Sequence, residues 1–175
     1  APFHDRSSRA YARSMGNLGD FVGMLASSTA LVEALQGRFD DAGSPRVTVS
    51  GISLGGWVTN LHRAFHDTAD RYAPIFAGAA LGEMFVSSVY RRMTGAIARD
   101  NPQQLRTVLD FEDAFCNVEA ADCTPLLARY DRIIEFDRQK SAYSGMDISV
   151  IEKGHVTGAL STGPIRDWLE KQATQ

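Results

Sequence analysis

The sequence has few cysteines, no excess of positive charge and no long apolar run, and each shortage excludes a class of protein. Two cysteines, Cys116 and Cys123, are too few for a disulfide framework. A local disulfide between them remains open, although two free thiols are favoured. The formal net charge of -3 gives no polybasic field for nucleic acid or an anionic membrane. No apolar run approaches the length that spans a bilayer. We therefore expect a cytoplasmic protein that acts on a small molecule.

What is present is typical of one soluble globular domain. A chain of 175 residues can bury a sizeable core, and we treat residues 1–175 as a single domain. Hydrophobic periodicity and turn residues predict strands that alternate with helices. This alternation favours a parallel sheet flanked by helices on both faces. The expected strands are 46–52, 72–80, 124–130 and 148–151, and the expected helices are 8–39, 57–65, most of 82–116, 138–143 and 165–173.

The strongest motif is a nucleophile elbow at Ser53. Gly51, Ser53 and Gly55 fit the pattern G-x-S-x-G between a β-branched strand and an amphipathic helix, the context that the motif requires. Side chains at the flanking positions are expected to collide with the neighbouring strand and helix, so glycine is needed there. The turn places the serine at the N-terminus of the following helix, whose dipole favours a developing oxyanion. The backbone N–H of Leu54 is the expected oxyanion donor.

A serine hydroxyl needs a general base, and His155 is best placed among the four histidines. It follows a predicted strand, so it is expected at the same edge of the sheet as Ser53. His62 and His66 are four residues apart on one predicted helix, but no further ligand for a metal is evident there. His4 lies in the opening loop with no assigned role. We expect neither a metal nor another cofactor.

The acid of the triad is expected after the strand that precedes the one leading to His155. Asp131 ends the predicted strand 124–130 and is preferred. Asp137 follows the alternative strand 132–136, and it leaves only 18 positions before His155. The chosen carboxylate would orient the imidazole and stabilise the imidazolium.

With Ser53, an aspartate and His155 in this order, the chain resembles the α/β-hydrolase superfamily. The resemblance implies an α/β-hydrolase-like fold with a small helical cap, which we place at 81–120. Apolar residues of this region are expected either to line an acyl pocket or, as the favoured alternative, to pack the cap onto the sheet. They are Met84, Phe85, Met93 and Phe115.

The resemblance departs from the family upstream. Family members have several strands before this point and a loop that supplies a second oxyanion donor, and residues 1–6 look like the end of one such strand. We therefore expect a chain that lacks the N-terminal strands, with a sheet edge that pairs with a missing segment or another copy.

The function expected from these residues is a carboxylesterase-like serine hydrolase that forms an acyl-enzyme on an ester-like substrate. Peptidase, thioesterase and lipase chemistry use the same constellation. The alternatives are an α/β-hydrolase-like binding or scaffold protein that is not catalytic, and an inactive fragment of a hydrolase.

Overall fold

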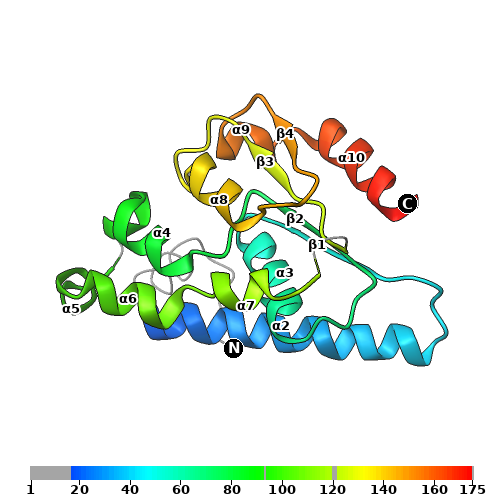
Figure 1. Cartoon of the computed structure of the whole chain (residues 1–175), viewed down its shortest axis with the longest axis horizontal. Helices are drawn as coiled ribbons and strands as arrows, with labels where there is room; N and C mark the ends of the chain where they lie inside the picture. Colours follow the sequence, from blue (N-terminus) through cyan, green and yellow to red (C-terminus); the bar gives the residue numbers. More distant parts are fainter. Residues whose placement is uncertain (1–16, 93, 120–121, 175) are drawn as a thin grey trace.

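The structure is a computed structural model, and it describes residues 17–92, 94–119 and 122–174. Four strands alternate with helices along the chain (Figure 1). The strands are β1 (Thr48–Ile52), β2 (Arg71–Ile75), β3 (Leu126–Ala128) and β4 (Ser149–Ile151). The helices are α2 (Leu18–Asp41), α3 (Leu54–Phe65), α4 (Leu81–Ser87), η1 (Val89–Arg92), α5 (Ala96–Asp100), α6 (Pro102–Leu109), α7 (Glu112–Cys116), α8 (Phe136–Ala142), α9 (His155–Ala159) and α10 (Thr162–Thr174).

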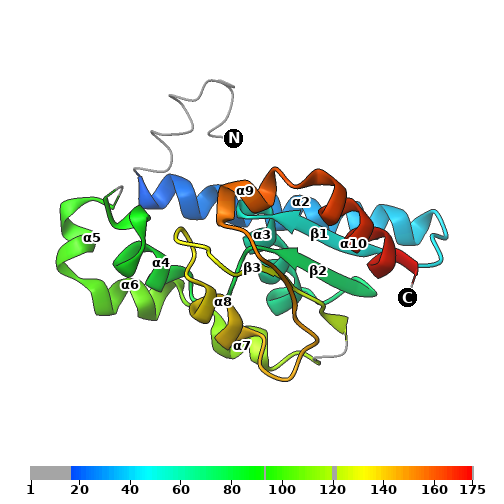
Figure 2. The same ribbon diagram turned by 90° about the horizontal axis from the view of Figure 1, so that it is seen from above.

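The strands form one parallel sheet in the order β1-β2-β3-β4. Because every strand runs the same way, all four carboxyl ends lie at one edge, where the segments after the strands meet. The predicted fold class, a parallel sheet with helices on both faces, is confirmed (Figures 1 and 2).

Alternating residues of the central strands divide the core between the two faces. Leu127 packs into the larger cluster, which holds side chains of α2, α3, α4, α6 and α7. Leu126 and Ala128 point to the other face, under α9 and α10. Both faces of β3 are therefore covered, which is why it reads as a continuous apolar run.

β2 contains a proline although it lies inside the sheet. The carbonyl of Tyr72 accepts from Thr124, and the N–H of Phe76 donates to Leu126, so alternate residues of β2 bond toward β3. Pro74 lies midway between them and has no N–H to donate. The β2–β3 ladder is correspondingly short, with one registered pair, Ile75 with Leu126.

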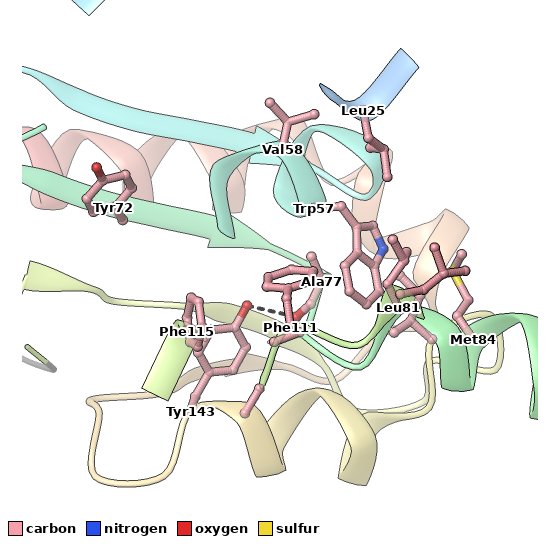
Figure 3. Packing of buried hydrophobic residues seen from close by; sticks show 14 of the residues in the cluster. Leu25, Trp57, Val58, Tyr72, Ala77, Leu81, Met84, Phe111, Phe115 and Tyr143 are labelled. Atoms are coloured by element: carbon pink, nitrogen blue, oxygen red, sulfur yellow. Dashed lines mark hydrogen bonds between the residues drawn. The ribbon is translucent and has the colours of Figure 1, made fainter. Parts of the chain in front are cut away.

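The middle of the chain, expected as a cap, consists of α4 to α7 between β2 and β3 (Figure 1). Met84, Phe85 and Phe115 are buried in the larger core cluster, so they pack these helices onto the domain. Figure 3 shows Met84 and Phe115 among the side chains of this cluster. Met93 lies outside the described residues. The division of the chain into a domain and a cap stays a prediction.

Helix α2 differs from the expectation that no apolar run is long enough to span a bilayer. By length and composition it could cross a membrane, with a mean hydropathy of 1.3 over its best window. Phe21, Met24 and Leu25 on its inner face are nevertheless buried in the core cluster that includes Trp57 and Val58 of α3. Core helices of globular domains meet the same criteria, so this finding alone places nothing in a membrane.

Two strands end earlier than expected. β2 stops at Ile75 rather than at residue 80, because Phe76 adopts φ 53°. β3 covers three residues, and 132–136 is not a strand. Cys116 and Cys123 are free thiols, one exposed and one buried. Burial raises the pKa of the Cys123 thiol to about 12, which makes it unreactive.

Candidate active site

Ser53 sits on a sharp turn between β1 and α3. Its backbone has φ 55° and ψ -110°, a conformation that costs free energy for a residue with a side chain. The Ser53 N–H donates to the carbonyl of Ile75 at 2.8 Å, which ties the turn to the next strand. The strained backbone and this tie are what the predicted elbow requires.

The glycines around Ser53 are not equally constrained. A Cβ atom on Gly51 would lie 2.4 Å from the carbonyl carbon of Gly55, so Gly51 is required. A Cβ on Gly55 itself would meet nothing within 4 Å. The expectation that glycine is needed at both flanking positions to avoid collisions is therefore wrong for Gly55. Gly56 takes that role, since its Cβ would approach Ala77 and the carbonyl of Ile75 to 2.7 Å each.

His155 is the first residue of α9, directly after Gly154, and it is buried. Its Nε2 lies 2.7 Å from Ser53 Oγ, and its Nδ1 lies 2.6 Å from Asp131 Oδ2. An ionised carboxylate only accepts hydrogen bonds, so Nδ1 carries the hydrogen. In the neutral imidazole Nε2 is then the acceptor for the serine hydroxyl, which is the arrangement of a general base.

Asp131 lies three residues after β3 and is buried. Its Oδ1 accepts from the backbone N–H groups of Ile133 and Ile134, each at 2.9 Å. Its Oδ2 accepts from Gln139 Nε2 at 3.0 Å as well as from His155. These donors compensate the buried carboxylate and fix its orientation.

The ring of Phe76 lies beside the imidazole of His155. The Phe76 ring is fully buried, and its centroid lies 5.9 Å from that of His155. The positive φ of Phe76 turns the chain at the end of β2, the strand between those that lead to Ser53 and Asp131. Phenylalanine is an unusual residue for this backbone region, so no local signal in the sequence indicates the turn.

The structure brings Ser53, His155 and Asp131 together and leaves the alternative acid outside. Asp137 lies in the first turn of α8 with its side chain exposed. Leu54, the expected oxyanion donor, is the first residue of α3. Its N–H is one of the four at a helix start that have no acceptor within the helix.

The remaining histidines belong to another part of the molecule. His62 is buried on α3, with Nε2 3.0 Å from Glu33 Oε2 and Nδ1 3.1 Å from Tyr72 Oη. Burial lowers the pKa of His62, and Glu33 partly offsets that effect. His66 stacks on His62, with ring centroids 5.2 Å apart. Within the described ranges, no group of three or more His, Cys, Asp or Glu is placed to hold a metal ion. His4 lies outside the described residues.

Comparison with known proteins bears on the fold. No protein-family model matches the chain, and no curated protein matches it. The structure is similar to the Pyrococcus horikoshii acylaminoacyl peptidase, with a TM-score of 0.54 and 16% identity over 66% of this chain. The chain has an α/β-hydrolase fold.

The match to the peptidase covers 21% of that protein, so this α/β-hydrolase-fold chain spans about a fifth of its length. A second similar structure is the enol-lactonase from Burkholderia xenovorans LB400, with a TM-score of 0.47 and 15% identity. That match covers 81% of this chain and 71% of the lactonase. At 16% identity the likeness to the peptidase describes the fold alone, and the chemistry must be argued from the site itself.

Proposed function

We propose that the chain is a serine hydrolase that cleaves ester-like acyl substrates through an acyl-enzyme on Ser53. The observation that carries the proposal is the continuous hydrogen-bonded path from Ser53 Oγ through His155 to Asp131, with steps of 2.7 and 2.6 Å. These residues lie at the ends of three different parallel strands. Such a constellation activates a serine whatever the fold that carries it.

In the proposed acylation, Ser53 Oγ attacks the carbonyl carbon while its proton moves to His155 Nε2. The carbonyl oxygen gains negative charge, and the Leu54 N–H at the helix start is the donor suited to bind it. Asp131 holds the imidazole and stabilises the imidazolium. His155 then gives its proton to the leaving alkoxide, and the acyl group stays on Ser53.

In the proposed deacylation, water attacks the acyl carbon as His155 Nε2 accepts a proton from it. Collapse of the second tetrahedral intermediate breaks the bond to Ser53 Oγ, which takes the proton back from His155. The products are a carboxylic acid and the free serine. An ester is the simplest substrate for this sequence, because an alkoxide is a better leaving group than an amine anion.

The rival function is that of a binding or scaffold protein that does not turn over substrate. Two apolar cavities, of about 680 and 370 Å³, lie along α2 and α6. Neither has Ser53 or His155 in its lining. The placement of both cavities away from Ser53 and His155 is the observation that favours a binding role.

The test is labelling with a fluorophosphonate probe, followed by peptide mapping. We expect the label on Ser53 and none in Ser53→Ala. Ser50→Ala is the matched control, because Ser50 lies on β1 three residues before Ser53 and its hydroxyl donates to the Ala73 carbonyl at 2.7 Å. Labelling of the control together with turnover of short acyl esters supports the hydrolase. A folded chain that stays unlabelled at every concentration supports the binding protein.

The pairing expected at the sheet edge stays a prediction. Among the described residues β1 pairs with β2 alone, and Ile52 beside the elbow is 38% exposed. An added strand would cover this edge next to Ser53. Light scattering and labelling rate across a concentration series test the proposal, since pairing of two copies makes both depend on concentration.

A further inference from the structure

Gln139 on α8 is a fully buried polar side chain beside the proposed triad. Its Nε2 donates to Asp131 Oδ2 at 3.0 Å and also to the carbonyl of Ile134. Its Oε1 is buried and has no hydrogen-bond partner within the described part of the chain. Burying an unpaired amide oxygen is unfavourable, so the two bonds made by Nε2 must compensate for it.

The two neighbours determine which way the amide points. Asp131 Oδ2 and the Ile134 carbonyl oxygen are both acceptors, and the amide NH₂ has two hydrogens to give them. The flipped amide would place Oε1 against a carboxylate oxygen and a carbonyl oxygen. The observed orientation is therefore the one that the charge distribution favours.

The bond from Gln139 goes to the same carboxylate oxygen that accepts from His155. Oδ1 of Asp131 is already held by the two backbone N–H groups of Ile133 and Ile134. A carboxylate that is held only at Oδ1 can still rotate so that Oδ2 moves. The bond from Gln139 restrains Oδ2, the oxygen that accepts from the His155 imidazole. A neutral donor achieves this without a positive charge that would compete with the imidazolium formed during turnover.

We propose that Gln139 is a positioning residue, which fixes Asp131 Oδ2 so that the carboxylate holds His155 in line with Ser53. This inference rests on the proposed hydrolase function. It predicts that loss of the amide donor weakens the chemical step more than substrate binding, because the amide bonds to Asp131 and Ile134 and acts on His155 through that carboxylate.

The test compares Gln139→Met with Gln36→Met. Gln36 is a matched control on α2: it too is buried, its Nε2 donates to Asp40 Oδ1 at 3.0 Å, and its Oε1 has no partner within the described residues. The readouts are kcat and KM for a short acyl ester, and the downfield proton resonance of His155 Nδ1–H. Thermal melting and circular dichroism verify that each variant is folded.

We expect Gln139→Met to lower kcat about tenfold with little change in KM, and to shift or broaden the resonance. Gln36→Met should leave kcat, KM and the resonance unchanged. If Gln139→Met does not fold, Gln139→Asn serves instead, since it keeps the amide but withdraws it by one methylene. An unchanged kcat and resonance in a folded variant would overturn the inference, as would an equal loss in Gln36→Met.

The resonance separates this inference from the proposed function. If the wild-type chain is folded but turns over no ester, the hydrolase proposal fails on its own account. The resonance still reports whether Gln139 fixes the Asp131–His155 pair. An altered resonance in Gln139→Met would then support positioning in a site that is not catalytic, and an unaltered one would overturn it.

Discussion

The ring of Phe76 lies against Gly158, so closely that a Cβ atom on Gly158 would approach its Cζ to 2.8 Å. The same ring contacts the imidazole of His155, with ring centroids 5.9 Å apart. Gly158 lies three residues after His155 in α9. The closeness of α9 to the end of β2 therefore sets where the imidazole lies.

Gly158→Ala should accordingly move His155 rather than unfold the domain. The added methyl group requires α9 or Phe76 to shift, and a displacement of about 1 Å at a catalytic group can cost about 100-fold in rate. Gly163→Ala in α10 is the control, because its Cβ meets nothing within 4 Å. In Gly158→Ala the ester turnover should fall while the melting temperature stays unchanged. In Gly163→Ala neither should fall. A Gly158→Ala protein with full activity would contradict the role given to this contact.

The glycines of the elbow should respond very differently to alanine. In Gly51→Ala the new Cβ would overlap the Gly55 backbone at 2.4 Å, so we expect a loss of about 3 kcal/mol or more in the free energy of unfolding. Gly55→Ala meets no atom and replaces a helical glycine, so stability should stay level or rise by about 0.5–1 kcal/mol. Urea denaturation of both variants measures the difference. Equal destabilisation by the two would refute the steric assignment.

The two candidate acids, Asp131 and Asp137, should differ clearly in how much their substitution lowers kcat. Asp131→Asn keeps the size of the side chain but removes the charge and favours the wrong imidazole tautomer, so kcat should fall by about 10³–10⁴-fold. Asp137→Asn should change kcat little, because that side chain is exposed. Steady-state kinetics with one ester decide between them. A large loss of kcat in Asp137→Asn would instead identify Asp137 as the acid.

Acid should destabilise the domain through His62. Burial lowers the pKa of His62 in the folded protein below its ordinary value of 6.5, so the unfolded chain binds the proton more tightly. The stabilisation is complete above about pH 6.5 and is lost as the pH falls toward the folded pKa. We expect the free energy of unfolding to fall between pH 7.5 and 5.5, by up to about 1.4 kcal/mol per pH unit.

Urea denaturation across that range tests the effect. His62→Gln should flatten the dependence of the free energy of unfolding on pH, and His66→Gln, at the stacked neighbour, is the control. The pH range ends above pH 5 because Glu33 contributes at lower pH. Hydrogen bonds from Thr68 and His62 lower the pKa of Glu33 despite the opposing effect of partial burial. Protonation of this carboxyl at lower pH therefore also reduces the free energy of unfolding. An unchanged slope in His62→Gln would assign the acid sensitivity to another group.

The parts of the site that are local in sequence could be predicted. The strand, the glycine and the helix around Ser53 form one continuous signal, and the order of strands placed Asp131 and His155 at the same edge. Gln139 and Phe76 could not be found this way. Gln139 lies among exposed charged residues of α8, and its contact with Asp131 exists only once the chain has folded.

The predicted ends of strands were wrong where tertiary contacts override the local preference of the residues. No residue pattern in 72–80 indicates that Phe76 takes a positive φ, so the strand was expected to continue. The motif pattern likewise names Gly55 as constrained, whereas the atoms that exclude a side chain surround Gly51 and Gly56. Which glycine meets Ala77 depends on how α3 packs on β2, and spacing along the chain carries no such information.

The hydrogen bond between Ser53 and His155 joins residues that are 102 positions apart. During synthesis Ser53 therefore leaves the ribosome long before His155, while the later strands of the sheet have still to be made. Reactivity toward the probe should arise only when β4 and α9 have been added beside β3. A pulse of probe on nascent chains of increasing length would therefore report when β4 and α9 reach their places beside β3.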